Sequence, residues 1–269
     1  MHPRVGLHQV AFLNESITAF LGHCRDIGVQ QATLVTPLLM RPRGEEEASR
    51  SLAGGGVRVT NINHPFALYP DLERDTGQAT AELNEVIDIA SALGAESIYL
   101  LTGARGALSW EQAAERFCEL TAPCKARADT AGVRLLVENA SAFNADIHIA
   151  HTLADTITLA SVAGVGVCVD VHACWAEAGL SDLIRRAMPL TGLIQVSDYV
   201  LGDRCAPCRA VPGDGAIPLK RIIGDALDAG YTGVFDIELV GPRIDEEGPR
   251  AATARAAHRV SAILTELGV

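Results

Sequence analysis

The chain has 269 residues, of which 48% are hydrophobic and 20% are charged. This composition supports a large buried core and excludes a mainly disordered chain. The formal net charge of -11 disfavours nucleic-acid and membrane partners, because both are bound through clusters of Lys and Arg. No apolar stretch approaches the roughly 20 residues needed to cross a bilayer. The N-terminus lacks the apolar segment of a signal peptide, and the seven scattered cysteines are typical of free thiols. We therefore expect a cytoplasmic protein.

Strand-like runs alternate with amphipathic stretches along the whole chain. Short runs of Val, Ile and Leu are typical of buried parallel strands, and the intervening stretches have helical lengths. The expected strand and helix pairs are Val5–Ala11 with Ser16–Asp26, Val29–Val35 with Glu45–Ala53, Val57–Ile62 with Thr76–Ala92, Ser97–Leu101 with Ser109–Ala131, Val133–Val137 with Leu153–Ala163, Val165–Val169 with Leu180–Ala187, Gly192–Val196 with Leu219–Ala229, and Val234–Ile237 with Arg250–Leu267.

Eight βα units without a Pro/Ser-rich linker predict an α/β fold, a closed (β/α)₈ barrel that forms one domain over residues 1–269. A doubly wound open sheet is the competing architecture. That fold usually has a glycine-rich phosphate loop after its first strand, whereas this chain has Gly6-Leu7-His8-Gln9-Val10 there. The barrel is the preferred prediction.

Four apolar runs in the second half of the chain end near an oxygen-bearing side chain. These side chains are Glu138, Asp170, Gln195 and Glu238. In a barrel the C-terminal strand ends form the active-site face, and carboxylates buried there need a partner to remain ionised. Three carboxylates and an amide predict a site for a hard divalent cation, Mn²⁺ or Mg²⁺ rather than Zn²⁺. The alternative is a set of helix caps and ion pairs at the strand ends.

Glu138 and Glu238 have a second predicted role. They come from strands three positions apart in a ring of eight, so we expect them to face each other across the mouth of the barrel. Two such carboxylates can remove and return a proton on the carbon beside a carbonyl. The metal would polarise that carbonyl and stabilise the enediolate.

Other polar and aromatic side chains near the strand ends are candidate substrate contacts, and each has an alternative as an ordinary buried or solvated residue. They are His8, His64, His148, His172, Trp175, Arg209 and Arg243. The two arginines suit an anionic or hydroxyl-rich end of a substrate. Cys205 and Cys208 have the spacing of a metal or redox pair, but there is no second pair, and we do not expect such a role.

Several motifs resemble those of the xylose-isomerase-like sugar phosphate isomerase/epimerase superfamily, which includes ketose 3-epimerases, hydroxypyruvate isomerase and inosose dehydratase. The matching pieces are Val137-Glu138-Asn139, Val169-Asp170-Val171-His172, Val196-Ser197-Asp198, Pro212-Gly213-Asp214-Gly215, Ala229-Gly230-Tyr231-Thr232-Gly233 and Asp236-Ile237-Glu238. The resemblance spans nearly the whole chain. It implies a TIM barrel and a divalent metal held by Glu138, Asp170, the strand-seven position and Glu238, with the two Glu residues as acid and base.

One position departs from the family pattern. The family commonly has His as the strand-seven ligand, where this chain has Gln195. An amide oxygen can still bind Mg²⁺ or Mn²⁺, directly or through water. It binds softer metals more weakly than imidazole does.

The leading functional hypothesis is a metal-dependent isomerase or epimerase that acts on a small sugar or hydroxy-ketone. A lyase that dehydrates a related keto-polyol through the same enediolate is the second hypothesis. One branch of the superfamily cleaves abasic DNA, but that activity needs a basic face, which the net charge of -11 argues against. A non-catalytic sugar-binding barrel is a further alternative. The resemblance also implies a homo-oligomer, either a dimer or a tetramer.

Overall fold

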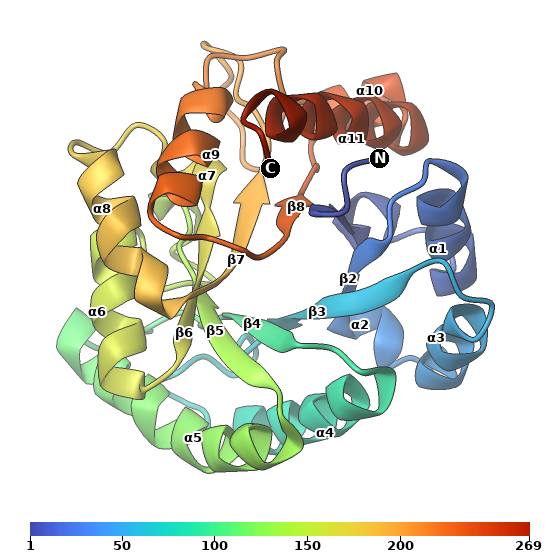
Figure 1. Ribbon diagram of the computed structural model, residues 1–269. Coiled ribbons are helices and arrows are strands. Elements are labelled where there is room, and N and C mark those ends of the chain that lie inside the picture. The colour runs from blue at the N-terminus through green and yellow to red at the C-terminus, as the bar shows by residue number, and fades with distance from the viewer.

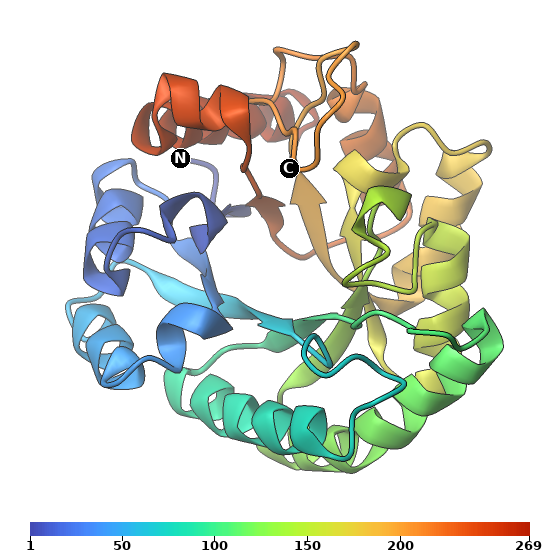
Figure 2. The ribbon, with the colours of Figure 1, turned by 180° about the vertical axis from the view of Figure 1, so that it is seen from behind.

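The computed structural model describes residues 1–269 and contains a closed barrel of eight parallel strands. The strands follow one another around the barrel in chain order, and β8 pairs with β1 to close it. Helices surround the strands on the outside (Figures 1 and 2). The predicted single-domain (β/α)₈ barrel is confirmed, and the open sheet is excluded.

The strands are β1 (Val5–His8), β2 (Gln31–Val35), β3 (Arg58–Pro65), β4 (Ser97–Leu101), β5 (Arg134–Glu138), β6 (Gly166–Asp170), β7 (Thr191–Val196) and β8 (Phe235–Ile237). The helices are α1 (Ile17–Asp26), α2 (Thr36–Leu39), α3 (Gly44–Leu52), α4 (Gln78–Leu93), α5 (Trp110–Ala131), α6 (Leu153–Ala163), α7 (Val171–Cys174), α8 (Leu180–Ala187), α9 (Leu219–Asp228), α10 (Pro242–Glu247) and α11 (Pro249–Glu266). Three short 3₁₀ helices are η1 (Gln9–Phe12), η2 (Ala142–Asn144) and η3 (Met188–Leu190). None of the helices combines the length and apolar composition that a membrane span requires.

Two strands end three residues away from their predicted C-terminal limits. β1 ends at His8 instead of Ala11, because the His8 side chain accepts a hydrogen bond from the Val10 backbone N–H and caps η1. β3 continues to Pro65 instead of Ile62, because its last residues remain paired with β4. The longer β3 places His64 inside a strand.

The interior of the barrel is filled with side chains beneath its mouth. Tyr99, Leu136, Cys168 and Leu193 form a buried cluster separate from the larger core of the molecule. The Tyr99 hydroxyl lies 2.5 Å from His8 Nε2, and this contact must cross the barrel interior because β4 and β1 are not neighbouring strands. A ligand therefore cannot enter the barrel below its mouth, and the C-terminal strand ends form the active-site face in this architecture.

A polar network also lies inside the barrel, around Asp236 on β8. Thr33 Oγ1 donates a hydrogen bond to Asp236 Oδ2 at 2.8 Å, and Ser97 Oγ donates to Asn61 Oδ1 at 2.7 Å. Asp236 is fully buried, and its Oδ1 atom has no hydrogen-bond partner. Burial raises the pKa of Asp236 to about 7, although the Thr33 hydrogen bond opposes this shift.

We predict that Asp236→Asn stabilises the protein in a pH-dependent manner. The pKa of Asp236 is higher in the folded state than its unfolded value of about 3.9. The protonated carboxyl group therefore makes its full contribution to the free energy of unfolding below about pH 3.9. That contribution is lost as the pH rises through about 7. The free energy of unfolding of the variant should exceed that of the wild type by a few kcal/mol at about pH 8 and by much less at about pH 4. Urea denaturation at both pH values measures this difference, and an equal difference at both would contradict the prediction.

Candidate metal centre

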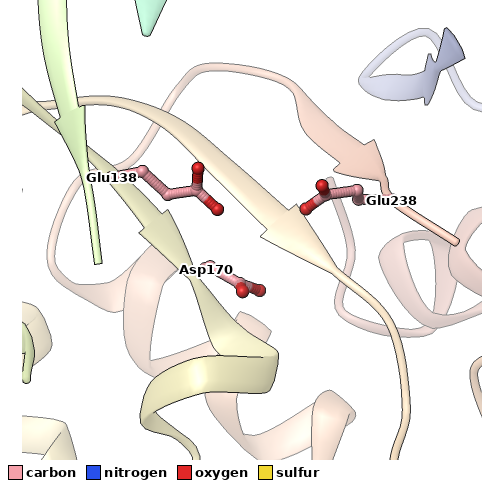
Figure 3. Close-up of side chains that lie close together, drawn as sticks. All are labelled: Glu138, Asp170 and Glu238. Carbon is pink, nitrogen blue, oxygen red and sulfur yellow. The ribbon is translucent and has the colours of Figure 1, made fainter. Parts of the chain in front are cut away.

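Three acidic side chains converge at the mouth of the barrel (Figure 3). Glu138 is the last residue of β5, Asp170 is the last residue of β6, and Glu238 directly follows β8. One carboxylate oxygen from each residue lies within 4.8 Å of the others, and all three residues are buried. These are three of the four predicted metal ligands. They form a candidate site for a divalent cation.

Gln195, the fourth predicted ligand, lies on β7 beside the carboxylates. It is paired in register with Asp170 on the neighbouring strand, so the two side chains lie on the same face of the sheet. Gln195 is completely buried, and neither its Oε1 nor its Nε2 atom has a hydrogen-bond partner. An unsatisfied buried amide costs free energy, and a bound cation is one partner that would satisfy its oxygen.

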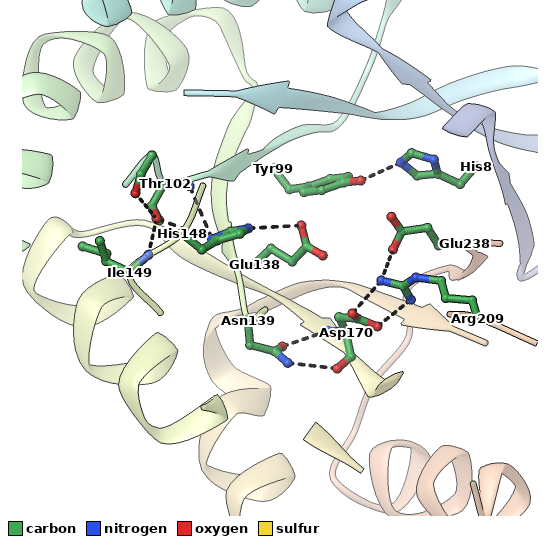
Figure 4. Close-up of polar contacts among 11 residues, drawn as sticks. His8, Tyr99, Thr102, Glu138, Asn139, His148, Ile149, Asp170, Arg209 and Glu238 are labelled. Atoms are coloured by element: carbon green, nitrogen blue, oxygen red, sulfur yellow. Dashed lines mark hydrogen bonds and ion pairs between the residues drawn. The ribbon is translucent and has the colours of Figure 1, made fainter. Parts of the chain in front are cut away.

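The sequence analysis predicted Arg209 as a substrate contact. In the structure, Arg209 contacts the acidic cluster itself (Figure 4). Its Nη1 and Nη2 atoms donate to the two oxygens of Asp170 at 3.0 and 2.8 Å. Nη2 also lies 3.0 Å from Glu238 Oε2. Burial alone would lower the pKa of Arg209, but Asp170 and Glu238 more than offset this effect, so the net shift is upward and the guanidinium remains charged.

The loop after β7 is folded so that Arg209 reaches Asp170. Asp198 and Ala210 exchange two backbone hydrogen bonds of 2.8 Å, which fixes the residue beside Arg209 against the end of β7. Asp198 Oδ2 accepts hydrogen bonds from the backbone N–H groups of Gly213 and Gly215 at 2.8 and 3.0 Å. A Cβ atom at Gly215 would lie only 2.4 Å from Asp198 Oδ1, so this close approach requires glycine.

Asn139 fixes the spacing between the ends of β5 and β6. Its Nδ2 atom donates to the Asp170 backbone oxygen at 2.9 Å, and its Oδ1 atom accepts from the Asp170 backbone N–H at 2.8 Å. Because Glu138 immediately precedes Asn139 in the sequence, this pair of hydrogen bonds holds two of the candidate ligands in a fixed relation.

The electrostatics of the cluster favour a divalent cation. When ionised, the three carboxylates contribute three negative charges and Arg209 contributes one positive charge, which leaves a net charge of -2. Burial, followed by repulsion from Glu238 and Asp170, raises the pKa of Glu138 well above its ordinary value. Burial also raises the pKa of Glu238 to about 7, against the opposing effect of Arg209. A divalent cation bound here would lower both pKa values and favour the ionised carboxylates.

The oxygen donors also suit such an ion. The Oε2 atom of Glu138 is buried and has no hydrogen-bond partner. Carboxylate and amide oxygens are the ligands that Mg²⁺ and Mn²⁺ prefer. The residues present therefore fit the metal that the sequence predicted.

Two histidines beside the cluster are neutral. His148 Nε2 lies 3.9 Å from Glu138 Oε2, and burial lowers the pKa of both His148 and His8 to about 3. His8 Nδ1 accepts a hydrogen bond from Val10, so in the neutral ring Nε2 carries the proton that points at the Tyr99 hydroxyl. Neutral imidazoles can contact substrate hydroxyls without adding charge.

A cavity of about 470 Å³ opens above these residues. The predicted residues that line it are His8, Glu138, His148, Asp170, His172, Trp175, Arg209 and Glu238. Gln195 does not line this cavity and is completely buried beside the cluster.

Two predicted substrate contacts lie outside the cavity. Asn63 lines it, and because side chains alternate along a strand, the next residue, His64, points to the other face of β3. His64 Nδ1 there lies 3.3 Å from Thr36 Oγ1. Arg243, at the start of α10, instead forms two hydrogen bonds with Asp203 at 2.8 and 2.9 Å. The structure does not bring either residue to the site.

Other residues of the site were missed by the sequence analysis. Tyr99 lies in an apolar strand run, and nothing in that run distinguishes it from a core residue. Tyr199 follows the Ser197-Asp198 motif, and Phe143 is an aromatic residue in an otherwise small and polar loop. Both line the cavity, and only the isolated aromatic character of Phe143 offered a signal for this.

Comparison with known proteins identifies the family. Residues 12–262 match the family model described as xylose isomerase-like TIM barrel. The chain belongs to this family. The resemblance inferred from the motifs is thereby confirmed.

The following relatives share 25% sequence identity or less with this chain. The chain is 25% identical over 217 residues to fructoselysine 3-epimerase of Shigella flexneri, which covers 78% of this chain and 76% of the relative. The structure is similar to that of protein SMc04130 from Sinorhizobium meliloti 1021, with a TM-score of 0.86, 22% identity, and 97% and 98% of the two chains covered. It is also similar to the IOLI protein with a bound zinc atom, with a TM-score of 0.83, 14% identity, and 98% and 99% covered. At these identities the two structures show the fold alone.

We predict that Mn²⁺ binds at the three carboxylates. Glu138→Gln, Asp170→Asn and Glu238→Gln should each weaken Mn²⁺ binding on the order of tenfold or more, because each removes a charged oxygen donor. Isothermal titration with Mn²⁺ measures the affinity. Asp236→Asn is a matched control, because Asp236 is a buried carboxylate outside the cluster. Unchanged affinity in all three cluster variants would show that the ion binds elsewhere.

We also predict that Gln195 sets the metal preference. Gln195→His should raise the affinity for Zn²⁺ relative to Mn²⁺ on the order of tenfold, because imidazole suits Zn²⁺ better than an amide oxygen does. Competition between the two metals, followed by metal analysis of the dialysed protein, gives the ratio. The same ratio in the variant and the wild type would exclude Gln195 from the metal site.

Proposed function

We propose that this protein is a divalent-metal-dependent isomerase or epimerase of a small sugar or hydroxy-ketone, acting by proton transfer beside a carbonyl. The observation that carries the proposal is the approach of Glu138 and Glu238 toward one point from opposite sides of the barrel mouth, with Asp170 between them (Figure 3). Fructoselysine 3-epimerase, whose name describes an epimerisation of this kind, is a relative over most of its length.

Glu138, Asp170 and Glu238 would hold the cation, and Gln195 would complete the set directly or through water. When bound, Mn²⁺ or Mg²⁺ would polarise the substrate carbonyl and stabilise negative charge that develops on its oxygens. The IOLI protein carries zinc, but the oxygen donors of the present chain favour a harder cation.

The two glutamates would transfer the proton. One carboxylate removes the proton from the carbon beside the carbonyl, and the electron pair of that C–H bond moves toward the carbonyl oxygen. The other glutamate then donates a proton to the same carbon from the opposite side, which inverts it. Alternatively, the proton goes to the neighbouring carbon while the hydroxyl on the first carbon passes its proton to the former carbonyl oxygen, which isomerises the substrate.

The surrounding side chains would orient the acidic cluster and the substrate. Arg209 holds Asp170 through two hydrogen bonds and remains charged. The neutral His8 and His148 line the same cavity and offer N–H groups or ring nitrogens to substrate hydroxyls.

Solvent exchange tests the proposed reaction. Metal-loaded protein is incubated in D₂O with a panel of ketoses and keto-polyols, and deuterium at the carbon beside the carbonyl is followed by nuclear magnetic resonance. We expect exchange that stops after chelation and falls on the order of a hundredfold or more in Glu238→Gln and Glu138→Gln, because each lacks one acid–base group. Asp236→Asn should retain exchange.

The outcomes of this experiment separate the alternatives. A product lighter by one water would identify the lyase instead of the isomerase. Exchange at the wild-type rate in Glu238→Gln, with circular dichroism showing an intact fold, would remove Glu238 from the mechanism.

A further inference from the structure

The cavity above the carboxylates has a second region with a different chemistry. Three aromatic side chains line it near the surface: Phe143 in η2, Trp175 after α7 and Tyr199 after β7. We call these three residues the aromatic rim. The acidic residues below are buried, whereas Phe143 is 84% exposed and Trp175 and Tyr199 are half-buried.

The rim is held in place by specific contacts. The rings of Trp175 and Tyr199 have centroids 6.2 Å apart, and His172 packs edge-on against Tyr199 at 5.9 Å. The Tyr199 hydroxyl donates a hydrogen bond of 2.7 Å to the Asp203 backbone oxygen. The polar end of Tyr199 is therefore already bonded, and the ring itself is what a ligand would contact.

The exposure of Phe143 has no structural explanation within the chain. It lies in a short 3₁₀ turn capped by Ser141, whose Oγ accepts a hydrogen bond from the Phe143 backbone N–H at 3.3 Å. This backbone geometry needs no aromatic side chain. A large apolar group exposed at a cavity mouth is a typical ligand-binding feature.

The charged residues that line the cavity form no built site for an anion. The acidic ones are Glu138, Asp170, Asp203 and Glu238, and the basic ones are Arg204 and Arg209. Asp203 is paired with Arg243, which lies outside the cavity. Arg209 is already bound to Asp170 and Glu238. Arg204 is exposed, and its guanidinium only approaches a backbone oxygen at 3.4 Å. A bound divalent cation would neutralise the acidic cluster, and only the exposed Arg204 would then face a phosphate group.

The size and lining of the cavity point to an apolar group. A volume of about 470 Å³ lies in the range that holds drug-sized ligands, which exceeds the needs of one small sugar. Additional apolar lining comes from Val10, Leu101, Ile147, Pro207 and Val240. The space that a sugar leaves unfilled is therefore bordered mainly by apolar and aromatic surface.

We propose that the aromatic rim is a binding site for an uncharged alkyl or aryl substituent on the hydroxy-ketone. The substrate is then a substituted, non-phosphorylated sugar whose reacting end lies at the carboxylates and whose apolar end contacts Phe143, Trp175 and Tyr199. This inference rests on the proposed function for the reacting end, while the rim itself is independent of the metal.

Three probes test the inference by isothermal titration into Mn²⁺-loaded protein: D-fructose, D-fructose 6-phosphate and 6-O-benzyl-D-fructose, a benzyl compound whose carbonyl carbon remains free. We expect the benzyl compound to bind on the order of tenfold more tightly than fructose, because its ring is transferred from water to the rim. The phosphate should give no gain over fructose. Equal binding of fructose and the benzyl compound, or tightest binding of the phosphate, would overturn the proposal.

Single substitutions test whether the aromatic rim causes the preference for the benzyl compound. Phe143→Ala should lower the preference for the benzyl compound over fructose several-fold. Because Phe143 is exposed, the substitution should leave the fold intact, which circular dichroism checks. Leu201→Ala is the matched control, because Leu201 is 70% exposed and does not line the cavity. An unchanged preference in Phe143→Ala would contradict the assignment of this residue to the site.

A fluorescence signal provides a second readout. The chain has two tryptophans, and Trp110 is bonded through Nε1 to the Ile149 backbone oxygen outside the cavity. In Trp110→Phe, Trp175 is therefore the only fluorescent tryptophan. The benzyl compound should shift its emission and fructose should not, whereas the absence of any shift with the benzyl compound would exclude contact with Trp175.

The two proposals fail in distinguishable ways. Mn²⁺ binding without a preference for the benzyl compound would refute the aromatic subsite and leave the proposed function intact. Preference for the benzyl compound in a protein that binds no Mn²⁺ would refute the metal-dependent function and retain the subsite.

Discussion

Three carboxylates lie within a few ångströms of one another inside the mouth of the barrel, and only the Arg209 guanidinium offsets their charge. In water such a cluster would be spread apart by its own repulsion, and burial makes the repulsion stronger. The closed barrel prevents the separation, because each carboxylate is attached to the end of a hydrogen-bonded strand. Raised pKa values for Glu138 and Glu238 are the result, and a divalent cation is a partner that would relieve the repulsion among the three carboxylates.

The loops maintain this arrangement. Asn139 joins the ends of β5 and β6 through both hydrogen bonds of its amide, and Asp198 anchors the loop that delivers Arg209. The same loop contributes Tyr199 to the cavity wall. The acidic centre and the aromatic rim are consequently parts of one folded unit, and a substrate that spans both would be held at its reacting end and at its substituent.

The sequence predicted the barrel and the acidic centre because both depend on local patterns. Each βα unit shows its strand as an apolar run, and Glu138, Asp170 and Glu238 mark the ends of three such runs. Contacts between segments that are far apart in the sequence were harder to predict from it. His64 was misplaced because strand β3 continues through pairing with β4, and Arg243 because its partner Asp203 lies 40 residues away in a loop. The pairing of Arg209 with the predicted ligands likewise depends on the folded loop after β7, which Asp198 anchors through hydrogen bonds.

The central claim is that one divalent cation binds between side chains from β5, β6 and the end of β8. Anomalous diffraction from crystals soaked in Mn²⁺ tests this claim most directly. The account predicts a single strong peak within bonding distance of Glu138, Asp170 and Glu238, together with the Gln195 amide or a water bound to it. A peak elsewhere, or no peak while Arg209 still bridges Asp170 and Glu238, would contradict it.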